Sequence, residues 1–365
     1  MRFPKFTEEW ETKPINDLAV VIGGGTPDTT VKSYWDGEIQ WFTPSEIGKT
    51  KYVDSSLRTI TEDGLNNSSA KRLPPNTILL SSRATIGECS LSLRECATNQ
   101  GFQSLVSKKC NVDFLYYLIQ TKKNDLIRKS CGSTFLEISA NEVRKIQVSI
   151  PSDVEQQKIA GLLSLIDERI ATQNKIIERL ETLIKGIRNE IFWKLRKNVG
   201  FNAIIGDVLD YEPPQSYIVE DTEYIDKGTP VLTANKAFIL GYTSETEGIY
   251  DKGDCIIFDD FTLDSKYVDF PFKVKSSAIK ILTAENKELL RYTFEFLKYL
   301  DLSTSEHKRH YIAETQNQEF ILPTTQIVRT IAHTFSILSL RMETAIKQRL
   351  LFEKQKQYLL RQMFI

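Results

Sequence analysis

Several features are scarce in this sequence, and each scarcity removes a class of protein. Only five cysteines occur among the 365 residues, and no two of them are spaced as C-x-x-C. An odd number in this arrangement favours buried thiols in a reducing compartment over a disulfide framework or a zinc site. No apolar run approaches the roughly 18 residues of a membrane span, and no signal-peptide core follows Met1–Lys5. We therefore expect a cytoplasmic protein with no membrane contact and no metal site.

An excess of one charge is missing as well. Lysine and arginine total 47 and aspartate and glutamate 48, which gives a net charge of -1. This balance does not by itself indicate nucleic-acid binding, although local basic patches can persist within it. With 41% hydrophobic and 26% charged residues, the chain has the composition of ordinary globular material and the length for two or three domains.

Catalytic constellations are also lacking. Asp259-Asp260 could hold a divalent ion, but nothing upstream completes such a site. Tyr211–Pro214 is similar to the Pro-Pro loop of adenine methyltransferases, yet no glycine-rich cofactor loop precedes it. His307 and His310 have no acidic or cysteine partner at ligand spacing. We predict no catalytic residue, and a stand-alone nuclease or DNA methyltransferase remains an alternative.

What the chain does contain is a long helical pattern from Asp153 to Lys197. Its apolar residues alternate three and four positions apart, which is a heptad pattern. The main seam positions are Ile159, Leu163, Ile166, Ile170, Ile177, Leu180 and Ile184. Such a helix is about 65 Å long at about 1.5 Å per residue. Because the seam is narrow, it requires a partner helix rather than a globular core.

The sequence supplies this partner by internal repetition. A shift of 172 positions places Ile150-Pro151 on Leu322-Pro323 and pairs identical residues such as Phe192 with Phe364. The shifted seam falls on Ile331, Phe335, Leu338, Met342, Phe352 and Leu359. The pattern indicates a repeated unit that consists of a whole domain followed by its helix.

Four parts follow from this repeat: a domain over 1–150, a helix over 151–199, a second domain over 200–322 and a second helix over 323–365. Short β-rich runs bounded by glycine, proline and asparagine precede a helical stretch in each domain. We expect an α+β fold with two similar mixed domains separated by two long antiparallel helices. This coiled coil would relate the two domains by an approximate two-fold axis.

Polar residues that follow the strands are the candidates for contact with DNA. Arg83 stands beside small hydroxyl donors, and such groups bind phosphates and guanine edges, whereas amides can pair with adenine. In the first domain we select Thr43, Arg83, Thr85, Asn99, Gln100, Thr134 and Phe135. In the second domain we select Lys236, Asp260, Thr262, Lys266, Lys308 and Arg309. A polar loop without a partner is the alternative for each residue alone, so the prediction depends on recurrence in both domains.

Several strings together resemble the specificity subunit of type I restriction-modification enzymes. They are Gly24–Pro27, Tyr34–Gly37, Trp41–Ser45, Leu79–Gly87, Ala97–Phe102, and Ile150-Pro151 with Glu155–Ala160. Pro230–Ala234, Gly241-Tyr242 and Ile256–Thr262 look like a second, divergent target-recognition domain. The second helix departs from the family pattern, because Thr324–Val328 replaces the acidic and amide-rich opening.

The resemblance implies a non-catalytic subunit that reads a bipartite target in double-stranded DNA, one half with each domain. It implies docking of two methyltransferase subunits on the helices and of restriction subunits in a larger complex. S-adenosylmethionine, ATP and magnesium would act in those partner subunits, with no cofactor in this chain. A coiled-coil scaffold whose domains bind protein is the remaining alternative.

Overall fold

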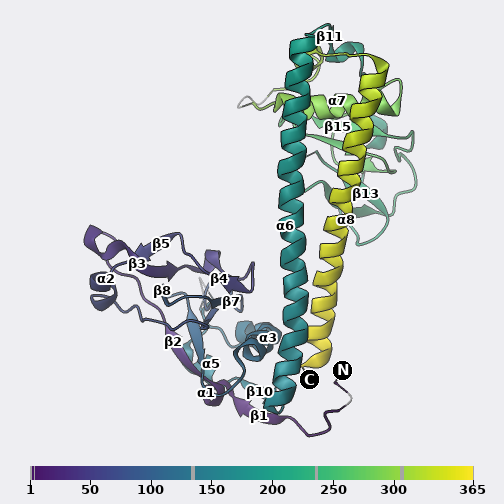
Figure 1. The fold of residues 1–365 in the computed structure, drawn as a ribbon. Coiled ribbons are helices and arrows are strands. Elements are labelled where there is room, and N and C mark those ends of the chain that lie inside the picture. The colour runs from purple at the N-terminus through teal and green to yellow at the C-terminus, as the bar shows by residue number, and fades with distance from the viewer. Residues whose placement is uncertain (1, 4, 133–135, 235–236, 305–307, 365) are drawn as a thin grey trace. The chain divides into compact units, whose positions relative to one another are not determined.

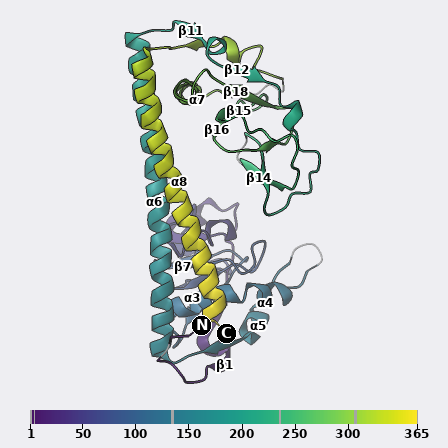
Figure 2. The same cartoon turned by 90° about the vertical axis from the view of Figure 1, so that its right-hand side faces the viewer.

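The computed structural model describes residues 2–3, 5–132, 136–234, 237–304 and 308–364. The chain divides into two compact units: unit 1 is Met1–Lys175 together with Lys347–Ile365, and unit 2 is Ile176–Ile346. Each unit therefore contains one globular block and a stretch of each of two long helices. These are α6 (Asp153–Asn198) and α8 (Thr325–Met363), which lie side by side in Figure 1 and in Figure 2.

Both ends of α6 have a local chemical cause. The helix begins two residues after Pro151, and its first turn carries Asp153 and Glu155, which interact favourably with the positive end of the helix dipole. Its last turn carries Arg196 and Lys197 at the negative end. Gly200 follows with a φ of 77°, the left-handed conformation that ends many helices.

The helices run antiparallel within each unit. In unit 1, the core joins residues near the start of α6, such as Leu163, to residues near the end of α8, such as Met363. In unit 2, the core joins Phe192 near the end of α6 to Phe335 near the start of α8. Every seam position predicted above is buried or half-buried. The apolar seam thus packs as the heptad pattern predicts.

The globular block of unit 1 is built on strands. One sheet has the order β2 (Ala19–Gly23), β9 (Gln103–Ser107), β6 (Ile78–Leu80), β7 (Cys89–Ser92), β4 (Tyr52–Val53). A second has the order β5 (Arg58–Ile60), β3 (Trp35–Phe42), β8 (Cys96–Thr98), and β1 (Glu11–Pro14) pairs antiparallel with β10 (Gln147–Ile150). The short helices are α1 (Ile15–Leu18), α2 (Glu62–Asn66), α3 (Val112–Thr121), α4 (Lys123–Arg128) and α5 (Ala140–Lys145).

The globular block of unit 2 follows a similar plan. One sheet has the order β12 (Asp210–Glu212), β18 (Ile279–Thr283), β15 (Cys255–Asp259), β16 (Ser265–Val268). A second has the order β14 (Ile239–Thr243), β13 (Thr229–Leu232), β17 (Lys273–Val274), and β11 (Ala203–Ile204) pairs antiparallel with β19 (Glu319–Phe320). Helix α7 (Lys287–Leu300) packs on β15 and β16.

Helices α3 and α7 are counterparts in the repeat. Each is capped by an asparagine, since Asn111 accepts from the backbone N–H of Phe114 and Asn286 from that of Leu289. Each also contacts the end of a long helix: Phe364, which directly follows α8, lies 5.2 Å from Phe114 in unit 1 (ring centroids). In unit 2, Phe192 of α6 lies 5.3 Å from Phe296 of α7. The two phenylalanines that the sequence shift paired therefore play the same role in the two units.

The expected fold class is confirmed: mixed α/β domains accompany two long helices that pack together. Within the part of the chain that the structure describes, no helix carries an apolar stretch able to span a bilayer.

Candidate nucleic-acid interface

The first predicted loop leaves strand β6 in unit 1 and spans residues 81–88. The backbone N–H of Ser81 donates to the carbonyl of Glu88 at 2.9 Å and closes the loop. Ala84 within it has a φ of 55°, a conformation that costs a residue with a Cβ about 1–3 kcal/mol. Strain of this kind is often found where a loop presents side chains for function.

Arg83 and Thr85 extend from this loop. The Arg83 side chain is 43% exposed and pairs with Glu137 at 2.7 Å, which raises the pKa of the guanidinium above its usual range. Thr85 is exposed and donates to the hydroxyl of Ser81 at 3.1 Å. The loop therefore offers a partly exposed, permanently charged donor, which forms an ion pair with the carboxylate of Glu137.

Two further segments meet the loop through the backbone of Ser82. Its N–H donates to the carbonyl of Gly101 at 2.8 Å, and its carbonyl accepts from the N–H of Ile138 at 3.1 Å. The first hydrogen bond joins the loop to the segment that carries Asn99 and Gln100, which precede Gly101. The second brings in the segment that ends at Ile138, where Glu137 is positioned to pair with Arg83.

The amide side chains have local partners already. Asn99 accepts from the N–H of Gly101 at 2.8 Å, and Gln100, which is exposed, accepts from the hydroxyl of Thr26. Thr43 lies close by, because the N–H of Asn99 donates to the carbonyl of Phe42, the residue before it. The hydroxyl of Thr43 donates to Glu46 at 2.6 Å. The structure thus brings Thr43, Arg83, Thr85, Asn99 and Gln100 together from three separate stretches of sequence.

Unit 2 repeats this arrangement with a shorter loop. The N–H of Asp259 donates to the carbonyl of Asp264 at 2.8 Å and closes the loop that follows β15. Asp260 then takes the place of Ser82: its N–H donates to the carbonyl of Ala278 and its carbonyl accepts from the N–H of His310. Leu263 has a φ of 61°, so this loop also contains a left-handed residue other than glycine.

Asp260 is engaged by other residues of unit 2. Its side chain is 2% exposed and forms an ion pair with Lys280 at 3.2 Å. The same carboxylate accepts from the backbone N–H groups of His310 and Tyr311 at 3.0 and 2.8 Å. The carboxylate thus holds the 308–311 segment against the loop, and a direct contact of Asp260 with DNA stays a prediction.

The other predicted residues of unit 2 fall into two places. Thr262 lies exposed on the loop, and Lys308 and Arg309 lie exposed beside it, with Lys308 paired to Glu314 at 2.7 Å and Arg309 3.5 Å from the hydroxyl of Ser277. Lys266 instead lies on β16, where its charge acts on Lys298 of α7.

Three predicted residues, Thr134, Phe135 and Lys236, lie outside the described residues. Sequence reasoning missed two side chains that hold the others in place: Glu137, which binds Arg83, and Lys280, which binds Asp260. No local sequence pattern identifies either residue, since the role of each depends on a partner 20 or more positions away in the sequence.

Enzymatic alternatives find no support in the described geometry. The carboxylate of Asp259 accepts from the backbone N–H groups of Phe261 and Thr262, so it shapes the loop. The ring of His310 is buried and faces Glu314 at 2.7 Å. Among the described residues, no cluster of three or more histidine, cysteine or acidic side chains could hold a metal ion.

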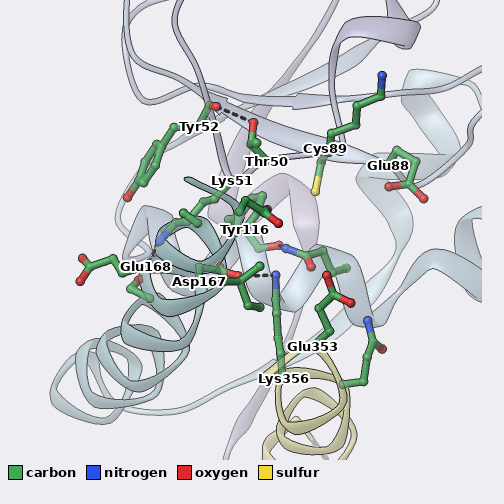
Figure 3. A pocket seen from close by; sticks show the side chains of 18 residues that line it. Thr50, Lys51, Tyr52, Glu88, Cys89, Tyr116, Asp167, Glu168, Glu353 and Lys356 are labelled. Carbon is green, nitrogen blue, oxygen red and sulfur yellow. Dashed lines mark hydrogen bonds and ion pairs between the residues drawn. The ribbon is translucent and has the colours of Figure 1, made fainter. Parts of the chain in front are cut away.

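A cavity of about 430 Å³ lies in unit 1 between α3, α6 and the end of α8 (Figure 3). Its two central cations are paired: Lys51 with Asp113 at 2.6 Å and Lys356 with Asp167 at 2.8 Å. Burial raises the pKa of the Cys89 thiol in its wall to about 12, so this thiol stays protonated near neutral pH. Each of these two cations therefore has an acidic partner within unit 1.

Comparison with known proteins agrees with this geometry. Residues 7–182 match the family described as "Type I restriction modification DNA specificity domain". The type I restriction enzyme MjaIX specificity subunit of Methanocaldococcus jannaschii is 36% identical over 221 residues, which cover 59% of this chain and 51% of that protein. The EcoR124I/EcoR124II specificity subunit of Escherichia coli is 42% identical over 151 residues, which cover 40% and 35%. The match thus spans about half, or less, of the length of these curated relatives.

Solved structures share the fold. A crystal structure of the S subunit of the type I restriction-modification system from M. genitalium superposes with a TM-score of 0.66 at 16% identity, and covers 100% of this chain and 99% of that chain. A structure from work on complex assembly and conformational transition of the type I R-M system gives a TM-score of 0.53 at 14% identity, with 98% and 97% covered. At these identities the likeness shows the fold alone.

Proposed function

We propose that the chain is a DNA specificity subunit of a type I restriction-modification system, which selects the DNA target while partner subunits perform the chemistry; the match of residues 7–182 to this family and the similarity to the curated subunits support the proposal. The observation that carries the proposal is the recurrence of one arrangement in both units. In each, a loop that leaves a central strand is joined by backbone hydrogen bonds to two other segments, through Ser82 in unit 1 and Asp260 in unit 2.

Each domain, 1–150 and 200–322, reads one half of a split target. Arg83, Thr85, Asn99 and Gln100 supply donors and acceptors in the first. Thr262, Lys308 and Arg309 supply them in the second, while Asp260 positions the segment that carries the last two. Each good base contact contributes about 1–3 kcal/mol of discrimination. The helices over 151–199 and 323–365 set the distance between the two halves, as dimeric readers do for half-sites about 34 Å apart.

Exposed apolar residues on the helices support docking of partner subunits. Leu165 and Ile337 occupy equivalent positions in the repeat, and their side chains are 59% and 41% exposed. Two nearly equivalent surfaces suit two copies of one partner. We assign them to two methyltransferase subunits that supply S-adenosylmethionine, with restriction subunits that use ATP and magnesium in the larger complex. The chain itself needs no cofactor for this role.

A domain exchange tests the proposal. Residues 1–150 are replaced by the first recognition domain of a relative, and methylated adenines are mapped after co-expression with the methyltransferase subunits. We expect one half of the target to change and the other half to persist. An unchanged target after a well-folded exchange would exclude DNA reading by this domain.

The alternatives have their own readouts. Cleavage or methyl transfer by the purified chain alone, with DNA, magnesium and S-adenosylmethionine, would favour an enzyme. Failure to bind any duplex even at low salt, where phosphate contacts are strongest, would favour a protein-assembly scaffold.

A further inference from the structure

A second cleft, in unit 2, differs in charge from the cavity of unit 1. It measures about 600 Å³ and lies between the last turns of α6 and the end of α7. Its walls include Lys185 and Arg188 of α6, Lys298 of α7, and the aromatic rings of Trp193 and Tyr299. We call it the basic cleft.

Two lysines of the basic cleft have no ion-pair partner in the described part of the chain. Among the described residues, neither Lys185 nor Lys298 has a carboxylate within ion-pair distance, and the same holds for Lys266 on the neighbouring strand β16. Arg188 is engaged by Glu295 at 2.8 Å. Asp301 is the acidic residue in the cleft wall.

Like charges are therefore held close together. Burial lowers the pKa of Lys298 below its usual range, and the charges of Lys266 and Arg188 lower it further, against the opposing effect of Asp264 and Glu295. Burying cations beside one another costs free energy, so an anionic ligand would stabilise the arrangement.

The repeat provides a comparison inside the same chain. Lys185 corresponds to Gln357 by the shift of 172, and Lys298 corresponds to Lys123 when the caps Asn111 and Asn286 are matched. Lys123 is paired with Glu88 at 2.5 Å. At equivalent places, unit 1 thus has a neutral amide and a lysine in an ion pair, whereas unit 2 has two lysines that form no ion pair with the described residues.

We propose that the basic cleft binds phosphate groups of the backbone of duplex DNA, independently of sequence. The assignment rests on the proposed function. Lysine and arginine are the residues that neutralise phosphates. Lys266 links the cleft to the reading loop, because its charge acts on Lys298 and it follows Thr262 by four residues, at most about 14 Å along the chain. This span is similar to the width of the major groove, about 12 Å. A duplex read at Thr262 therefore has backbone phosphates within reach of Lys266 and its neighbours.

The test measures salt dependence of DNA binding by the full chain. Fluorescence anisotropy with a labelled duplex of arbitrary sequence is recorded over a range of KCl concentrations for the wild type and for the double variant Lys185→Gln, Lys298→Gln. We expect the slope of log K against log[KCl] to fall by about 1.8, because each lost phosphate contact removes about 0.9. Lys123→Gln is the matched control and leaves the slope unchanged.

Each other outcome has a defined meaning. A double variant that folds normally by circular dichroism and keeps the wild-type slope overturns the proposal. Normal DNA binding combined with lost co-purification of methyltransferase subunits also overturns it and identifies an acidic protein partner. Protection of Lys298 from chemical acetylation by millimolar inorganic phosphate, but not by duplex DNA, overturns the assignment to DNA. A wild-type chain that binds no duplex at low salt refutes the proposed function together with this site.

Discussion

Replacing Asp260 by asparagine removes one charge from a buried ion pair. The side chains of Asp260 and Lys280 are 2% and 4% exposed, and their charged atoms lie 3.2 Å apart. The Lys280 ammonium otherwise faces the hydroxyl of Tyr211 at 3.3 Å. Breaking a buried pair costs about 3–5 kcal/mol, because the remaining charge is left without compensation.

The loss of stability expected for Asp260→Asn lies at the low end of this range. The side-chain oxygen of the asparagine can still accept from the N–H groups of His310 and Tyr311, so Asp260→Asn destabilises unit 2 by about 3 kcal/mol. Asp260→Ala also leaves those two donors without an acceptor, which adds about 1–3 kcal/mol. Combining Asp260→Asn with Lys280→Met removes the stranded charge and restores part of the lost stability.

Hydrogen exchange measured by mass spectrometry resolves this effect locally. Peptides from β15 and β18 report on unit 2, and peptides from α3 report on unit 1 as an internal control. We expect protection to fall only in unit 2, in the order Asp260→Ala, Asp260→Asn, then the double variant. A change for Asp260→Asn below about 0.5 kcal/mol, far under the range for a broken buried pair, would refute the reasoning.

Four further predictions concern other parts of the chain. In a methylation or binding assay, Arg83→Ala relaxes the target preference at one position by about 1–3 kcal/mol. Glu137→Gln is the control, because it frees the guanidinium and keeps the preference. An Arg83 variant with unchanged affinity and preference would argue against a base contact. Met363→Ala destabilises unit 1 by about 2–5 kcal/mol, because this side chain at the end of α8 is 3% exposed in the unit 1 core. Faster hydrogen exchange in α3 measures the loss. Faster hydrogen exchange confined to unit 2 would contradict this packing. Maleimide at neutral pH labels only the exposed Cys131 in the native protein, since burial raises the pKa of the four other thiols to about 12. Labelling of more than one thiol would contradict the burial of those four. The unfolded thiols titrate at lower pH than the folded ones, so stability falls as the pH rises above about 9.

The long helices could be predicted because their cause is local. A heptad pattern depends on residues three and four positions apart, and Pro151 and Pro323 each stand two residues before the start of a helix. The shift of 172 positions also predicted the common role of Phe192 and Phe364. The same shift places the start of α6 at Asp153 on the start of α8 at Thr325, as the structure has them.

The reading loops could be predicted only in part. Their position after β6 and β15 follows from strand and turn signals, and the cluster of Thr43, Arg83 and Asn99 agrees with the residues selected for the first domain. The internal partners of Asp260 could not be predicted, because a carboxylate in a loop has the same local pattern whether it faces solvent or caps a buried segment.

The repeat, the helices and the loops that follow the strands are encoded locally, since each depends on neighbouring residues and a regular period. The meeting of charges is visible only in the folded chain: Asp260 with Lys280, Arg83 with Glu137, and the lysines of the basic cleft with one another. These pairings depend on strand register and on the packing of α6 against α7, which join residues from 20 to more than 100 positions apart.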